Sequence, residues 1–207
     1  YNSWSQGSSC MKVAASDNIV VFRASEVAFL RAEGALRGWN MGGSPKDLYE
    51  AGIRLSFEEN NISSGVESYL ANTGKVEGYK DPLKGQSGQT YDYSGSINTA
   101  VTVAWAGGDF EKSLEQIITQ KWIANFPNGM ESWSEYRRTG YPKLMPMAAN
   151  ASSGIVDDTE GARRMPYPTD EYRENKESVE AAVLTLTQES KTKKGDSMAT
   201  HVWWDCK

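Results

Sequence analysis

The sequence predicts an all-α protein built from irregular tetratricopeptide-like helix hairpins, with long loops and little β structure. Three observations support this fold class. Apolar and small residues recur at helical spacing in two regions, 26–59 and 111–138. Each region is interrupted by a short polar turn, and two helices joined by so few residues must run antiparallel. The segments between and after these regions are long and rich in Gly, Ser, Asn and Thr.

The first hairpin is expected to begin at Ser25, which can cap a helix over residues 26–39. After a turn, Ser44 followed by proline restarts a helix as the N-cap and first-turn residues. This second helix carries a broad apolar face over residues 48–57. Gly52 within it would let the partner helix approach closely.

Residues 60–110 have a different character. Only residues 66–70 suggest a short helix. Residues 90–105 show a partial alternation of apolar and polar residues, which is compatible with a strand carried on a loop. Loops of this length inside a compact domain are uncommon and are often functional.

The second hairpin is expected to start at Glu111 and to turn at residues 127–129. Its second helix, residues 130–138, stops at the breaker cluster 140–142. Residues 143–168 are predicted to be loop, and Thr169 begins a last helix that runs to about residue 184. The starts of the two hairpins lie much further apart than the period of about 34 residues in regular tetratricopeptide repeats, so the stacking is irregular.

Composition excludes several classes of protein. The chain has 207 residues and a net charge of −5, which argues against a nucleic-acid partner. No window reaches the roughly eighteen apolar residues of a transmembrane helix. The first residues lack the features of a signal peptide, so we expect an interior piece of a longer protein. Cys10 and Cys206 either form one bridge or are two independent thiols.

Several phrases in this order resemble the SusD/RagB family of Bacteroidetes. They are ASEVAFLRAEGALRGW (24–39), YEAGIRLS (49–56), ITQKWIA (118–124), ESWSEYRRTGYP (131–142), RRMPYP (163–168) and WWD (203–205). The resemblance implies that residues 1–207 form a single carboxy-terminal helical domain of that family. The amino-terminal segment, signal peptide and lipid-bearing cysteine of the family are missing from this stretch. In related proteins the amino-terminal half supplies part of the glycan site.

The resemblance also implies a function. It indicates a surface-exposed, lipid-anchored protein of the outer membrane that captures oligosaccharide or polysaccharide. The captured glycan would be handed to a SusC-like TonB-dependent transporter, and no cofactor is implied. The alternatives are a helical-repeat scaffold for protein interactions, or capture of a non-glycan nutrient such as peptide.

Catalytic and metal sites are not expected. Glu131 and Glu135 share a helix face, but adjacent arginines would lower their pKa values instead of raising one, as glycoside hydrolysis requires. We expect Arg137 and Arg138 to pair with Glu33 or Glu131 and to lock the hairpins together. His201 is the single histidine; together with Asp205 and Cys206 it falls short of four metal ligands, and we expect it at a surface or interface. Residues 157–161 do not match EF-hand spacing and are expected to be a solvated loop.

Aromatic residues on loops are the predicted glycan-binding residues, because their rings can stack on the flat C–H faces of sugars. Trp39, Trp122 and Trp133 lie on apolar helix faces and are assigned to the core, and Trp203-Trp204 are expected to bury against the helices. The stacking candidates are Trp4, Tyr79, Tyr91, Tyr93 and Trp105. Candidates for polar contacts to the sugar are Asn2, Asp92 and Asn98.

Overall fold

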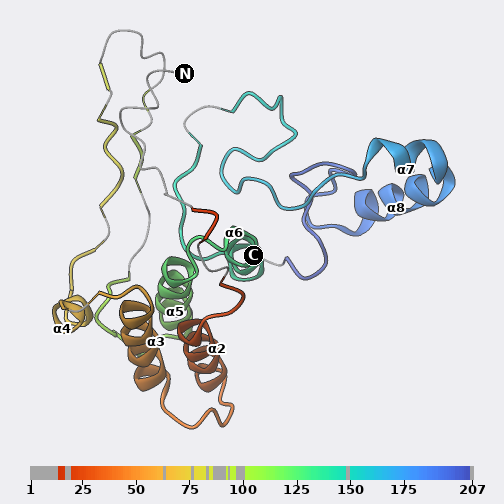
Figure 1. Cartoon of the computed structure of the whole chain (residues 1–207). Coiled ribbons are helices and arrows are strands. Elements are labelled where there is room, and N and C mark those ends of the chain that lie inside the picture. Colours follow the sequence, from red (N-terminus) through yellow and green to blue (C-terminus); the bar gives the residue numbers. More distant parts are fainter. Residues whose placement is uncertain are drawn as a thin grey trace.

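The described part of the chain is helical. The computed structural model describes residues 14–16, 20–62, 64–75, 77–82, 84–85, 92, 94–96, 101–147 and 150–205. Its helices are α2 (Ala24–Leu36), α3 (Pro45–Glu59), α4 (Val66–Leu70), α5 (Phe110–Ala124), α6 (Gly129–Thr139), α7 (Thr169–Glu174) and α8 (Lys176–Glu189), as Figure 1 shows. Within these ranges only isolated β-bridges accompany them. The predicted all-α class is confirmed.

Helices α2 and α3 form the first predicted hairpin. Ser44 caps α3 by accepting a hydrogen bond from the Asp47 amide at 3.1 Å. The two helices approach so closely that a Cβ added to Gly52 would lie 2.7 Å from the ring of Phe29. Phe29 belongs to the main core cluster together with Ala32, Leu48, Tyr49, Ile53, Ile117 and Ala124. Gly52 therefore allows the close approach of the two helices, as predicted.

The start and end of α2 differ from the prediction. Arg23, not Ser25, occupies the N-cap position. Ser25 lies in the first turn, where its amide and hydroxyl donate to the Glu59 carboxylate at 3.0 and 2.6 Å. The Glu59 carboxylate of α3 thus accepts hydrogen bonds from the first turn of α2. Local sequence patterns could not identify this partner, because it lies 34 residues further along the chain. The helix ends at Leu36, so Trp39 lies in the following turn and is 62% exposed instead of buried.

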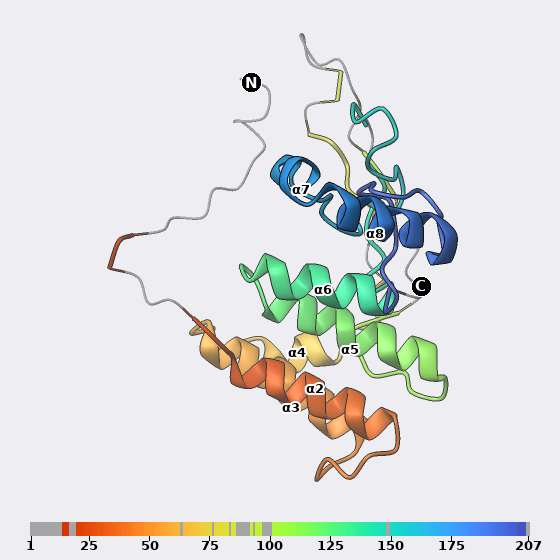
Figure 2. The same ribbon diagram turned by 90° about the vertical axis from the view of Figure 1, so that its right-hand side faces the viewer.

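Helices α5 and α6 form the second hairpin, and α5 packs against both α2 and α3. Figure 2 shows the α5–α6 pair stacked on the α2–α3 pair. Lys121 of α5 is 1% exposed and lies 3.7, 3.3 and 3.5 Å from carboxylates of Glu26, Glu131 and Glu135. This buried cation therefore ties α2, α5 and α6 together.

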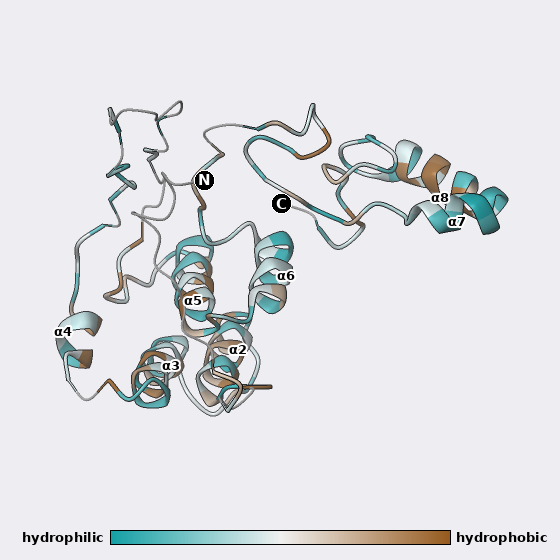
Figure 3. Ribbon diagram, turned by 45° about the horizontal axis from the view of Figure 1, so that its top comes forward, coloured by the Kyte–Doolittle hydropathy of each residue, from teal (hydrophilic) through white to brown (hydrophobic). Residues whose placement is uncertain are grey.

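The last predicted helix is two helices. A break at Asn175 separates α7 from α8, which pack on each other and project away from the hairpins in Figure 1. In Figure 3, α7 is almost wholly hydrophilic, whereas α3 and α5 carry hydrophobic residues among polar ones. No helix in the described ranges is long and apolar enough to cross a membrane.

Three other positions contradict the predicted burial. Trp122 is 39% exposed and Trp203 is 90% exposed, although both were assigned to buried positions. His201, expected at a surface or an interface, is 1% exposed and is therefore not a surface residue. Trp133 and Trp204 are half-buried, and Trp133 Nε1 donates to the Ala162 carbonyl at 2.7 Å. Helix periodicity identified apolar faces, but it could not tell which face meets another element.

Candidate functional site

The predicted stacking residues lie mainly on the long segment between α4 and α5. Its outgoing and returning arms run antiparallel at two bridges, Lys75 with Thr102 and Tyr79 with Gly95. At the second bridge the Gly95 amide donates to the Tyr79 carbonyl at 3.0 Å. Figure 1 shows the described parts of these arms rising away from the helices. The strand expected within residues 90–105 is reduced to these single bridges in the described residues.

The returning arm is anchored on the helical core by two buried side chains. Gln116 of α5, 1% exposed, donates to the carbonyls of Thr102 and Ala104 at 2.7 and 2.8 Å. Its side-chain oxygen accepts from the Ala106 amide at 3.2 Å. The fully buried Tyr49 donates its hydroxyl to the Val103 carbonyl at 2.7 Å, and burial raises the pKa of that hydroxyl well above its usual value. These bonds hold the base of the segment in one position.

The two described aromatic candidates occupy different environments. Trp105 is half-buried against the main core cluster, with its ring centroid 5.1 Å from that of Tyr49. Part of its ring therefore anchors the segment. Tyr79 is 42% exposed and lies further along the arm. Of these two rings, Tyr79 offers more surface to a ligand.

Asp92, on the same segment, can offer a charged acceptor. The Asp92 carboxylate accepts hydrogen bonds from Lys84 at 2.7 Å and from the Ser94 amide at 2.9 Å. These bonds lower the pKa of Asp92 to about 2. Asp92 is thus ionised at neutral pH and suited to accept from a sugar hydroxyl. The other candidates, Asn2, Trp4, Tyr91, Tyr93 and Asn98, lie outside the described residues, as do Cys10 and Cys206.

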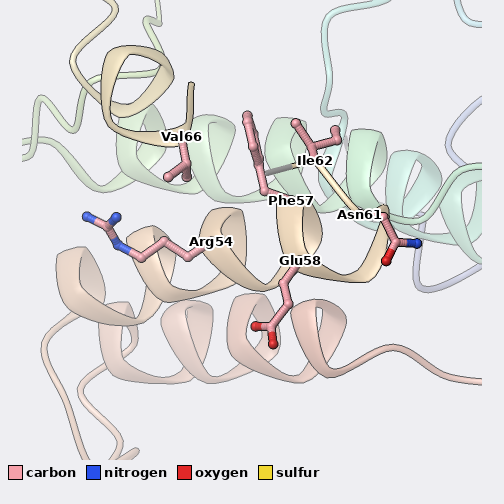
Figure 4. A pocket seen from close by; sticks show the side chains of 6 residues that line it. All are labelled: Arg54, Phe57, Glu58, Asn61, Ile62 and Val66. Atoms are coloured by element: carbon pink, nitrogen blue, oxygen red, sulfur yellow. The ribbon is translucent and has the colours of Figure 1, made fainter. Parts of the chain in front are cut away.

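A hollow of about 390 Å³ lies between α3 and α4 but lacks converging polar groups. Figure 4 shows that Phe57, Ile62 and Val66 supply its apolar walls, while Glu58 points away from them. Arg54 forms an ion pair with Glu67. A sugar site needs several hydrogen-bonding groups directed at the ligand, so this hollow is a poor candidate for one.

Glu33 and Glu135 form structural ion pairs with Arg138. Arg138 donates to both oxygens of Glu33 at 2.8 and 2.7 Å, and to Glu135 at 3.0 and 2.8 Å. Burial acts to raise the pKa of Glu33, but the hydrogen bonds and charge of Arg138 and Arg37 outweigh it, and the pKa is lowered. The predicted pairing of Arg138 with Glu33 is confirmed.

Among the residues that the structure describes, Arg137 pairs with neither Glu33 nor Glu131, the partners predicted for it. Its guanidinium lies between the rings of Trp133 and Trp204, 3.5 and 4.6 Å from their centroids. Its Nη1 donates to the Arg163 carbonyl at 2.8 Å. The arginine therefore joins α6 to the carboxy-terminal segment, a contact that only the fold brings about.

Metal sites are absent from the described ranges, where no group of three or more His, Cys, Asp or Glu side chains could hold an ion. In the 157–161 loop, Asp157 accepts from the Thr159 amide and hydroxyl and from the Glu160 amide at 2.8–2.9 Å. These bonds lower the pKa of Asp157 to about 2. The carboxylate thus closes a turn.

Comparisons with known proteins cover nearly the whole chain. The model of a family described as SusD-like, Susd and RagB outer membrane lipoprotein, matches residues 2–205. A solved SusD homologue from Bacteroides ovatus is 88% identical, with a TM-score of 0.91 over 99% of this chain and 41% of the other. One from Bacteroides thetaiotaomicron is 50% identical, with a TM-score of 0.82 over 95% of this chain and 40% of the other.

A third solved relative has a described ligand. This chitin-binding SusD homologue from Flavobacterium johnsoniae is 46% identical, with a TM-score of 0.75 over 90% of this chain and 36% of the other. None of the curated proteins matches the chain. The chain thus spans about two fifths of the length of the solved relatives it matches.

Proposed function

Because the chain belongs to the SusD/RagB family of outer-membrane lipoproteins, we propose that it takes part in capturing oligosaccharide or polysaccharide at the bacterial cell surface without cleaving it. The captured glycan passes to a SusC-like TonB-dependent transporter. The observation that carries the proposal is the family match over residues 2–205, in a family that includes a chitin-binding member. Chitin oligosaccharides are therefore the first ligands to test.

The segment between α4 and α5 supplies the stacking surface in this proposal. Gln116 and Tyr49 hold its base before any ligand arrives, so binding loses little conformational entropy there. The exposed ring of Tyr79 stacks on a sugar face, and Asp92 accepts hydroxyl hydrogen bonds. Trp105, Tyr91, Tyr93 and Trp4 remain further candidates for stacking, and Asn2 and Asn98 for polar contacts.

The environment of Glu33 supports capture without hydrolysis. A general acid for glycoside hydrolysis needs a raised pKa and a partner carboxylate across a cleft. The Glu33 carboxylate is held by Arg138 with a lowered pKa, which is unsuited to that role. Incubating the protein with a bound oligosaccharide and following new reducing ends tests this point, and none is expected.

Isothermal titration against a glycan panel, with chitotetraose first and a peptide mixture in parallel, tests the capture itself. Tyr79→Ala is expected to weaken glycan binding at least about fivefold, since truncating a stacking aromatic costs about 1 kcal/mol or more. Tyr79→Phe keeps the ring and should bind as the unaltered protein does. Tight binding of peptide with no glycan bound would refute the proposal.

A further inference from the structure

A second cavity, lined by residues outside the segment between α4 and α5, lies at the carboxyl end of α6. It measures about 440 Å³ and is walled by residues 136–144 on one side and 159–163 on the other. This volume falls in the range of small-molecule sites, roughly 300–1,000 Å³. The sequence patterns placed its residues in or next to the predicted helix 130–138, the breaker cluster 140–142 and the loop 143–168, with no role in binding.

One wall is held in place by buried charges. Arg163 and Asp205, each 2% exposed, pair through Nε and Oδ2 at 2.8 Å and through a second contact between Nη2 and Oδ1. The buried His201 lies with Nδ1 3.2 Å from Asp205 Oδ1 and with Nε2 2.7 Å from Glu160 Oε2. The Glu160 side chain, which lines the cavity, is still 40% exposed. A buried framework therefore positions an accessible carboxylate.

The other wall follows the last turn of α6. Gly140 ends the helix in the left-handed region (φ 73°), and Tyr141 then turns inward to donate its hydroxyl to Glu111 Oε2 at 2.9 Å. The Lys143 ammonium lies 4.7 Å from the centroid of the Tyr141 ring. Lys143 forms no ion pair with any residue that the structure describes. Its donors are available to a ligand.

The balance of charges indicates the class of ligand. Asp205 neutralises Arg163, so the remaining charges at the cavity are the Lys143 cation and the Glu160 carboxylate. An anionic ligand would be repelled by the Glu160 carboxylate, and a cationic ligand would be repelled by the Lys143 ammonium. A neutral polyhydroxylated molecule can accept from the ammonium and donate to the carboxylate, while Leu144 and the tyrosine rings cover its C–H faces.

We propose that this cavity is a second glycan subsite that binds one neutral sugar residue through its hydroxyls, between Lys143 and Glu160. The inference rests on the proposed capture of glycan and adds a position that the loop aromatics do not supply. Two subsites on one chain of sugars raise affinity by making the second contact intramolecular.

The test measures the affinity of the protein for chitotetraose and the other tetrasaccharides of the panel by titration calorimetry. Glu160→Gln and Lys143→Met should each weaken binding about tenfold, the loss expected when a charge-assisted hydrogen bond is removed. Leu144→Trp, which fills the cavity without touching the buried charges, should weaken it as much. The matched controls are Glu177→Gln and Lys191→Met at exposed positions. Both should bind as the unaltered protein does.

Melting temperature is followed for every variant, because Glu160 contacts the buried His201. If the variants bind like the controls while Tyr79→Ala binds weakly, the second subsite is refuted and glycan capture stands. If the unaltered protein binds none of the glycans, both proposals fall. Binding of glucuronate in place of glucose, abolished by Lys143→Met, would overturn the neutral class of ligand.

Discussion

Replacing Asp205 with asparagine tests the buried framework that holds the carboxy-terminal segment. The substitution removes one negative charge from a side chain that is 2% exposed and leaves the guanidinium of Arg163, also 2% exposed, without its counter-ion. Breaking a buried ion pair from one side costs about 3–5 kcal/mol of unfolding free energy. For a chain of this size that corresponds to a fall in melting temperature of about 6–20 °C.

The assay is urea unfolding followed by circular dichroism, with Asp170→Asn as the matched control. Asp170 also pairs with an arginine, Arg173 at 3.1 Å, but their side chains are 75% and 71% exposed. Exposed pairs contribute at most about 1 kcal/mol, so this variant should stay near the unaltered protein. Equal losses for the two substitutions would refute the role assigned to burial. The double replacement Arg163→Met with Asp205→Leu should recover most of the stability, because no unpaired charge remains.

Two further outcomes are expected. Gly52→Ala should lower the free energy of unfolding by about 1–3 kcal/mol, because the new methyl group would lie 2.7 Å from the Phe29 ring. Gly129→Ala, with nothing within 4 Å of the new methyl group, should change it by less than about 0.5 kcal/mol. Equal urea midpoints for the two variants would contradict this packing. Burial raises the pKa of Glu33, but Arg138 and Arg37 together lower it by more, so the folded protein binds this proton less tightly than the unfolded chain does. Its contribution to stability is present above the ordinary pKa of 4.5 and is lost as the pH falls below that value. Between about pH 6 and pH 3.5 the urea midpoint of Glu33→Gln should therefore fall less than that of the unaltered protein. An equal fall in the two proteins would refute the lowered pKa of Glu33.

The helices could be predicted because their signals are local. Ser44 before a proline, and Gly140 after the last turn of α6, mark helix ends through bonds and dihedral angles within a few residues. The break at Asn175 was missed, since the residues on both sides have ordinary helical preferences. The family was also recognisable, because its phrases survive in order along the chain.

The candidate sites were predictable only in part. Tyr79 and Asp92 stood out by residue type and by position on a long polar segment, and their place in binding remains a prediction. The cavity beside Lys143 and Glu160 left no trace in the sequence. Its walls are separated along the chain and meet only after folding.

The sequence by itself determined the helical class, the two hairpins and the family, because periodicity, caps and ordered motifs are properties of neighbouring residues. Only the tertiary structure decided which faces are buried, and it placed His201 inside and Trp39 outside. It also chose the long-range partners, Glu59 for Ser25 and Asp205 for Arg163. The physical reason is that burial and ion pairing depend on distances between segments far apart in sequence, which no local pattern encodes.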